Sequence, residues 1–398
     1  MLNNFEHCVY TKFYFGKDAE KQAGEVLSEA GATTVLIHHD SGQFLYDTGL
    51  LERVKSNLAE FGLKVFELGG VKPNPRISLA REGVELCKKE GVDYILAIGG
   101  GSAIDSSKAI SIGAKYGGDV WDFYSKAYAG GLPDRLPLAV ILTYPATGSE
   151  SSTSSVLSNE EGALKRDYSD QLLRPRYAFM NPELTYTLPP YLTACGIVDI
   201  FSHIVERYFA PETPFGSMDY MAESLLRCLT VYGPGVLLNP TDYDMRAEIM
   251  WIGTVAHNNT VGVGRRQDWS SHMMGHEVSG LYDIAHGASL SMIMPAWMRY
   301  VYKTDVARFA RYASEVFGVV YDCDNLEKTA LQGVERTEAF FHSLGMPVRF
   351  SDAKLPQDDL EELARKTADV RADTRTIGAF VTLHENDILA ILKDAAGV

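Results

Sequence analysis

The first 143 residues alternate between short apolar runs and helical segments, and this alternation restricts the fold more than any other feature. Between the runs, residues 50–61 and 77–90 show helical periodicity with charged outer faces. Strands that alternate with helices predict a mostly parallel sheet that is covered on both faces. The runs are brief and rich in branched residues, as buried parallel strands are, and they occupy residues 33–37, 63–67, 93–98 and 137–143.

The pattern of apolar and polar residues changes after residues 188–190, which read Leu-Pro-Pro. Residues 151–181 mix Thr, Ser and Tyr with apolar residues, and they predict extra strands or loops that complete a first domain. Beyond them the spacing is helical, and Pro190 suits the first turn of a helix. At 398 residues the chain is too long for one ordinary core. We therefore predict an α/β domain over residues 1–189 and an all-helical domain over residues 190–398, of which only residues 393–398 are expected to fray.

Charge and cysteine content exclude several classes of protein. The 37 basic and 52 acidic residues give a net charge of −15, which repels phosphate backbones and anionic membranes, so neither nucleic acid nor a membrane is expected as a partner. The five scattered cysteines form no CxxC pair, which is typical of a reducing compartment. The chain shows neither a basic leader nor an apolar run long enough to cross a bilayer, and we predict a cytoplasmic enzyme.

A glycine loop predicts an anion site. Residues 99–102 read Gly-Gly-Gly-Ser, directly after the apolar run 93–98 and before a helical stretch at 103–114. A strand, a glycine turn and a helix N-terminus in this order suit a pyrophosphate, because backbone N–H groups and the helix dipole attract its charge. The loop matches neither a Walker A motif nor GxGxxG. Taken alone, it also fits a turn that needs glycine only for close packing.

Further polar residues are expected at the same edge of the sheet. Residues 71–75 (VKPNP) present Asn74, and residues 142–150 (LTYPATGSE) leave another strand with small hydroxyl donors. Ligands of parallel sheets bind where the strands end. Asp40 closes the first strong strand, where an acid accepts hydrogen bonds from an adenosine ribose and repels a 2′-phosphate. The alternative is a solvent-facing turn aspartate, and we interpret the adjacent His38 and His39 as loop residues.

Residues 268–287 contain three of the ten histidines, and a helical reading places His272 and His276 on one face. Asp199 and His203 have the same spacing within an apolar helix, where a buried carboxylate needs a partner such as a metal ion. Together with two histidines of residues 268–287 they would form an N3O set suited to Fe(II) or Zn(II). Spacing does not decide which two histidines bind, and a single histidine on a mixed helix is more often structural.

Hydrolase motifs are absent from the sequence. A zincin needs Glu directly after the first histidine, where this chain has Met273, and Gly275 excludes the inverted HxxEH form. The chain also lacks the GxSxG elbow of serine hydrolases. The remaining histidines have no partner at ligand spacing and are interpreted as structural: His7, His257, His342 and His384.

In combination, the motifs resemble the iron-dependent (group III) alcohol dehydrogenase family. In chain order they are VxPNP, GGGS with Asp105 and Lys108 following, LxxPATGSE, TYTLPP, DxxxH, and HMMGHE followed by AHG. The QDW at residues 267–269 is similar to the butanol dehydrogenase and broad-specificity aldehyde reductase branch. The resemblance runs from about residue 15 to residue 287. It implies a dehydroquinate synthase-like fold, with a Rossmann-like dinucleotide-binding domain at residues 1–189 and an all-helical metal-binding and substrate domain at residues 190–398.

The resemblance also implies roles for individual residues. Gly100, Gly101 and Ser102 would hold the pyrophosphate. The residues implied near the nicotinamide or its ribose, and so in catalysis, are His276, Asp105 and Lys165. The residues implied to line the cofactor cleft are Asn74, Thr143, Thr147 and Leu188. The implied metal ligands are Asp199, His203, His272 and His286.

The implied activity is reversible hydride transfer between NAD(P)(H) and a primary alcohol or aldehyde of butanol type. The ion, Fe(II) or Zn(II), would act as a Lewis acid on the substrate oxygen, and the enzyme would be a homodimer. Related enzymes with glycines in place of Asp40 admit NADP(H), so this chain is expected to favour NAD(H). The alternatives are a polyol dehydrogenase of glycerol type and a dehydroquinate synthase-like lyase, although the lyase expects basic residues near the metal where this chain is mostly apolar.

Overall fold

The computed structural model describes residues 3–128, 130–132, 134–162, 164–211, 215–371 and 373–398. The chain divides into two compact units. One is Cys8–Leu188, and the other is Pro189–Val398 together with the N-terminal residues up to His7. Among the described residues, no helix combines the length and the apolar character that crossing a membrane requires.

A six-stranded parallel sheet forms the centre of the unit Cys8–Leu188, in the order β1-β8-β5-β4-β2-β3. The four strands predicted from the apolar runs are confirmed as β2, β3, β4 and β5. Every residue of β4 and β5 is buried, which explains why these strands are continuous apolar runs without alternation. The strands are β1 (Lys12–Phe15), β2 (Thr34–Asp40), β3 (Lys64–Val71), β4 (Tyr94–Gly99), β5 (Leu138–Leu142) and β8 (Tyr177–Met180).

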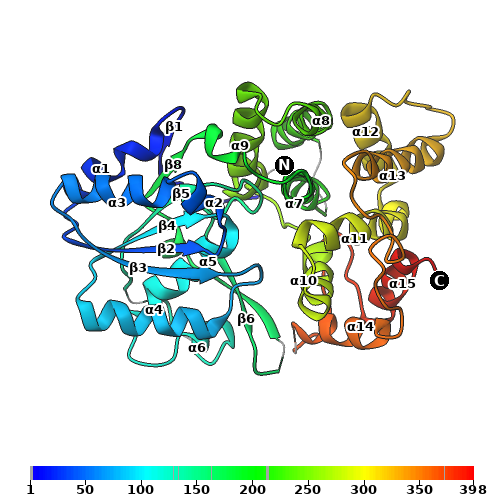
Figure 1. Cartoon of the computed structure of the whole chain (residues 1–398). Helices are drawn as coiled ribbons and strands as arrows, with labels where there is room; N and C mark the ends of the chain where they lie inside the picture. The colour runs from blue at the N-terminus through cyan, green and yellow to red at the C-terminus, as the bar shows by residue number, and fades with distance from the viewer. Residues whose placement is uncertain (1–2, 129, 133, 163, 212–214, 372) are drawn as a thin grey trace. The chain divides into compact units, whose positions relative to one another are not determined.

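Helices cover both faces of this sheet (Figure 1). Helices α1 (Ala23–Glu29) and α3 (Leu50–Glu60) lie on one face, and α4 (Ile77–Glu90) and α5 (Gly101–Gly113) lie on the other. The predicted extra strands after residue 151 are β8 and an antiparallel hairpin. The unit also contains the short helices α2 (Phe44–Asp47) and α6 (Trp121–Tyr124) and the hairpin strands β6 (Ser154–Asn159) and β7 (Leu164–Ser169).

The parallel arrangement brings distant polar residues to one edge. Because all six strands run in the same direction, their carboxyl ends lie at one edge of the sheet. Asp40 ends β2, Gly99 ends β4 and Thr143 directly follows β5. The predicted polar loops therefore share the edge where ligands of such sheets bind.

The second unit is helical, and α7 (Pro190–Tyr208) is its most buried helix. Every residue of α7 from Thr193 to Tyr208 is buried, including the polar residues Asp199, His203 and Glu206. Pro190 occupies the predicted first turn. The other α-helices are α8 (Ser217–Leu238), α9 (Tyr243–His257), α10 (Ser270–Tyr282), α11 (His286–Val301), α12 (Val306–Phe317), α13 (Leu326–Ser343), α14 (Leu360–Asp369) and α15 (Glu385–Ala396).

The end of the chain differs from the prediction. We expected residues 393–398 to fray, but α15 continues to Ala396. Ile391, Leu392 and Ala395 are fully buried, and the Ala395 carbonyl accepts a hydrogen bond of 3.0 Å from the Phe350 N–H. Apolar residues at helical spacing anchor this segment in the core of the helical unit. The charged residues between them hide this spacing in the sequence.

Candidate metal centre and cofactor loops

Helix α7 carries the first half of the candidate metal centre. Asp199 and His203 are one turn apart and Glu206 follows one turn later, so all three side chains share one face of the helix. The three residues are 2%, 3% and 0% exposed. A carboxylate buried this deeply needs a cation or hydrogen-bond donors.

Helices α10 and α11 bring histidines to this face. His272 lies in the first turn of α10, and His286 is the first residue of α11. His272 Nε2 is 3.5 Å from Asp199 Oδ1, and His286 Nε2 is 3.9 Å from the same oxygen. One ligand atom from each of these three residues lies within 4.8 Å of the other two. We call Asp199, His272 and His286 the three-ligand cluster.

The three-ligand cluster has the dimensions of a coordination sphere. Two atoms that are each about 2.1 Å from an ion lie about 3.4 Å apart at the tetrahedral angle. Asp199 Oδ1 and His272 Nε2 are buried, and neither has a hydrogen-bond partner within the part of the chain that the structure describes. Imidazole nitrogen and carboxylate oxygen are donors that Fe(II) and Zn(II) accept. The residues present therefore fit a divalent transition-metal ion.

His203 lies beside the three-ligand cluster and is not part of it. Its Nδ1 is 3.4 Å from Asp199 Oδ1, and its ring centroid is 4.3 Å from that of His272. His257, the last residue of α9, places its ring centroid 4.2 Å from that of His203. His257 therefore belongs to this group of histidines, although it was interpreted as structural from the sequence.

His276 lies at the margin of the group. Its ring centroid is 6.3 Å from that of His272 and 4.9 Å from that of His286. One helical turn separates it from His272, and the three-ligand cluster does not include it. Spacing left open whether His276 or His286 joins Asp199 as a ligand. In the structure, it is the ligand atom of His286 that lies close to Asp199.

Burial and neighbouring charges set the protonation of two candidate ligands. Burial, followed by the neighbouring His257 and His272, lowers the pKa of His203 well below its usual value. Burial also acts to lower the pKa of His272, but the charges of Glu206 and Asp199 outweigh it and raise that pKa to about 9. A cation that binds His272 must displace this proton, so metal binding is expected to release protons.

The predicted pyrophosphate loop joins β4 to α5. Gly99 ends β4, Gly100 is the N-cap, and α5 begins at Gly101. A Cβ atom at Gly101 would lie 2.4 Å from Thr147 Oγ1, so glycine is what allows the two predicted loops to approach. Ser102 is half-buried in the first turn. The first-turn N–H groups and the helix dipole suit a phosphate at this position.

Asp40 lies against the glycine loop. Its Oδ1 accepts a hydrogen bond of 2.7 Å from the Gly42 N–H, and its Oδ2 is 3.0 Å from where a Cβ atom of Gly99 would stand. Burial raises the pKa of the Asp40 carboxyl, and the Gly42 N–H partly offsets this rise. His38 and His39 are not loop residues as predicted. Both are buried within β2, because the sheet is covered on both faces.

Three further predicted residues, Asp105, Lys165 and Asn74, are held in place by side-chain hydrogen bonds. Asp105 accepts bonds from Ser149 Oγ at 2.5 Å and from the Val156 N–H at 3.0 Å. Lys165 Nζ donates to Asn74 Oδ1 at 2.9 Å. The last two cofactor candidates, Thr143 and Leu188, are held by backbone hydrogen bonds. The Thr143 N–H donates to the Gly99 carbonyl at 3.1 Å, and the Leu188 N–H donates to the Thr185 carbonyl at 3.1 Å.

Comparison with known proteins agrees with this geometry. Residues 11–182 match the family model of iron-containing alcohol dehydrogenases. Residues 193–396 match the C-terminal model of the Fe-containing alcohol dehydrogenase family. The chain belongs to the iron-containing alcohol dehydrogenase family. The predicted family is thereby confirmed, and the relatives and solved structure described next confirm the predicted enzyme class and fold.

Relatives cover nearly the whole of this alcohol dehydrogenase. The NADH-dependent butanol dehydrogenase A of Clostridium acetobutylicum is 36% identical over 391 residues, which cover 98% of this chain and 99% of the relative. The NADPH-dependent aldehyde reductase YqhD of Escherichia coli is 34% identical over 367 residues, covering 92% and 93%. The crystal structure of NADH-dependent butanol dehydrogenase A from Thermotoga maritima has a TM-score of 0.95 and 35% identity, and covers 99% of each chain.

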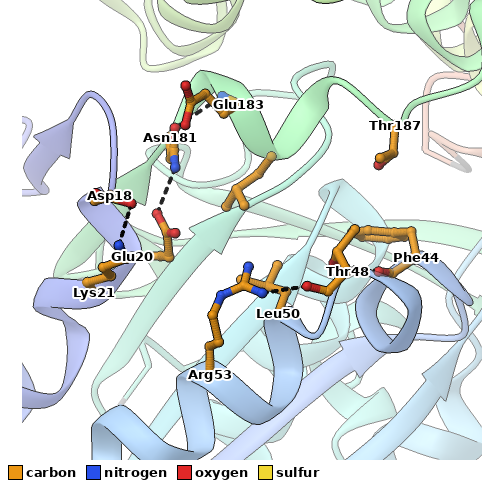
Figure 2. Close-up of a pocket in the computed structure, with 11 residues that line it drawn as sticks. Asp18, Glu20, Lys21, Phe44, Thr48, Leu50, Arg53, Asn181, Glu183 and Thr187 are labelled. Atoms are coloured by element: carbon orange, nitrogen blue, oxygen red, sulfur yellow. Dashed lines mark hydrogen bonds and ion pairs between the residues drawn. The ribbon is translucent and has the colours of Figure 1, made fainter.

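This alcohol dehydrogenase also has a pocket of about 370 Å³ at the carboxyl edge of its sheet (Figure 2). Its walls come from the segments that follow β1, β2 and β8, and Phe44, Leu50 and Leu184 supply apolar surface. Figure 2 shows Asn181 directed toward Glu20, to which it donates a hydrogen bond of 3.0 Å. The sequence did not single out these residues, because their common position depends on the order of the strands.

Proposed function

We propose that this chain transfers hydride reversibly between NAD(H) and a short primary alcohol or its aldehyde, at a divalent metal ion. The three-ligand cluster carries this proposal, because it places a carboxylate and two imidazoles at coordination distances in a buried site. The names of the relatives, butanol dehydrogenase and aldehyde reductase, support the substrate class. We propose Asp199, His203, His272 and His286 as the ligands, with Fe(II) or Zn(II) as the ion.

The residues of the helical unit have distinct roles in this proposal. The ion, when bound, supplies Lewis-acid chemistry at the substrate oxygen. The low pKa of His203 leaves its imidazole neutral at pH 7, as a ligand must be. The His276 imidazole, at the margin of the histidine group, would help to pass the proton of the substrate hydroxyl to solvent during oxidation and back during reduction.

The unit Cys8–Leu188 is proposed as the dinucleotide-binding domain and the helical unit as the metal-binding and substrate domain. Gly100, Gly101 and Ser102 would hold the pyrophosphate at the start of α5. Asp105 and Lys165 would lie near the nicotinamide or its ribose. The residues proposed to line the cofactor site are Asn74, Thr143, Thr147 and Leu188.

Asp40 is the basis for proposing NAD(H) over NADP(H). Its carboxylate lies beside Gly99, at the edge of the sheet where the polar loops gather. A carboxylate at this position accepts hydrogen bonds from ribose hydroxyls and repels the 2′-phosphate of NADP(H). The relatives include both an NADH-dependent and an NADPH-dependent enzyme, so membership of the family does not decide the cofactor.

We also propose a homodimer that works in the cytoplasm. The dimer follows from the family resemblance, and light scattering at assay concentration tests it. All five cysteines, each among the described residues, are free, which supports a reducing compartment.

The replacement His272→Ala tests the proposed function. We expect the variant to lose bound metal and turnover of butanal, while NADH binding measured by fluorescence persists, because the glycine loop lies in the other unit. The exposed His342→Ala serves as the matched control and is expected to keep metal and activity. A His272→Ala enzyme with full turnover and no metal would contradict the proposal. Faster oxidation of glycerol than of butanol by the wild type would favour a polyol dehydrogenase.

A further inference from the structure

Glu206 joins two parts of the candidate metal centre. It is fully buried on α7, and its Oε1 accepts hydrogen bonds from the Ser271 N–H at 2.6 Å and the His272 N–H at 3.2 Å. Its other oxygen, Oε2, is hydrogen-bonded to His272 Nδ1. One carboxylate therefore contacts both the first turn of α10 and the ring of a candidate ligand.

The contact decides which ring nitrogen of His272 faces the cluster. A carboxylate accepts hydrogen bonds only, so the single proton of the neutral, metal-binding imidazole must be on Nδ1. The lone pair is then on Nε2, and Nε2 is the atom that lies 3.5 Å from Asp199 Oδ1. Histidine ligands are commonly fixed in this way by a carboxylate that does not itself bind the ion.

We propose that Glu206 is a positioning residue, which holds His272 in the tautomer and orientation that bind the metal. The proposal rests on the proposed metal site, and it adds a residue that is not a ligand. The competing explanation is that Glu206 only caps the start of α10, through its bonds to two backbone N–H groups.

Asp268 offers a matched control for that explanation. It is also buried at the start of α10, and it accepts hydrogen bonds from the N–H groups of Ser270 at 2.9 Å, Ala379 at 2.9 Å and Phe380 at 2.8 Å. These three bonds all go to backbone groups. Asp268→Asn therefore weakens the start of α10 without changing the acceptor of the His272 ring.

The experiment is a titration of the chelator-stripped full-length protein with Co²⁺ and Zn²⁺. In Glu206→Gln the amide offers one oxygen for two sets of donors, so the His272 proton loses its carboxylate acceptor. We expect metal affinity to fall about 10- to 100-fold and the visible spectrum of bound Co²⁺ to change. Asp268→Asn should bind both ions with an affinity within about threefold of the wild type. Its loss of melting temperature should be about the same as that of Glu206→Gln.

The possible outcomes separate this inference from the proposed function. Wild-type protein that binds neither ion contradicts the metal site itself. The positioning role is overturned if the wild type binds the ions and Glu206→Gln binds them with the same affinity. It is also overturned if Asp268→Asn loses as much metal affinity as Glu206→Gln. If Glu206→Gln does not fold, zinc-loaded wild type with ¹⁵N-labelled histidine decides the question by NMR. At least one zinc-bound ring must then carry its proton on Nδ1, and a spectrum with every bound ring protonated on Nε2 overturns the proposal.

Discussion

Replacing the buried Lys108 with methionine should change how stability depends on pH. Lys108 lies on α5, two turns after the glycine loop, and none of its surface is exposed. Its Nζ donates hydrogen bonds to Ser149 Oγ at 2.8 Å, to Ser152 O and Oγ at 3.1 Å and to Ser154 O at 2.7 Å. The ammonium group thus ties α5 to the PATGSE motif, through Ser149, and to the residues that follow it.

The size of the effect follows from the pKa of this lysine. Burial lowers the pKa of Lys108 from 10.5 to about 8, although the charges of Asp105 and Glu150 act in the opposite direction. Between these two pH values the unfolded chain binds a proton that the folded chain does not, so the free energy of unfolding rises with pH. At about 1.4 kcal/mol per pH unit, the rise is about 3 kcal/mol between pH 8 and pH 10.5.

Urea unfolding at pH 7.5, 9.0 and 10.5 measures this difference. The wild type should gain about 3 kcal/mol relative to Lys108→Met across the range, because methionine does not titrate. The exposed Lys88→Met serves as the control and should follow the wild type at each pH. A difference between wild type and Lys108→Met that stays constant within about 0.5 kcal/mol would refute the reasoning.

Three further substitutions test other parts of the structure. A Cβ atom at Gly287 would lie 2.1 Å from the Cys195 carbonyl oxygen, so Gly287→Ala should push α11 from α7, lower stability by about 1–3 kcal/mol in urea unfolding and weaken Co²⁺ binding. Asp40→Gly should raise the ratio of NADPH to NADH activity at least about tenfold in steady-state kinetics, because it removes a charge that repels the 2′-phosphate. The buried Asp219 carboxylate lies 2.8 Å from Arg308 and 3.1 Å from Arg265. Asp219→Asn leaves both buried arginine charges without this partner and should lower the free energy of unfolding in urea by about 3–5 kcal/mol.

Each of these expectations has an opposing result. A Gly287→Ala protein as stable as Gly117→Ala, whose new Cβ meets no atom within 4 Å, would show that the two helices tolerate the methyl group. A wild type that already prefers NADPH would contradict the role proposed for Asp40. A loss below about 1 kcal/mol in Asp219→Asn would mean that the arginines find other partners.

Local patterns in the sequence were sufficient where one element sets the geometry. The run at residues 93–98 predicted β4, because a parallel strand covered on both faces must be apolar throughout. Asp199 and His203 were predicted to share a face because the helical period alone determines it. In contrast, His38 and His39 looked like loop polar residues, and only the covering of β2 by helices on both sides explains their burial.

In the candidate metal centre, the residue types and the spacing of the ligands within each helix follow from local sequence patterns. Spacing alone did not show that His286 rather than His276 reaches Asp199, because α10 ends at Tyr282 and His286 starts another helix. Before the structure, only the family resemblance implied His286. The contacts of Glu206 with His272 and of His257 with His203 also join separate helices. Such contacts depend on how α7, α9, α10 and α11 pack, and no pattern within one helix encodes that packing.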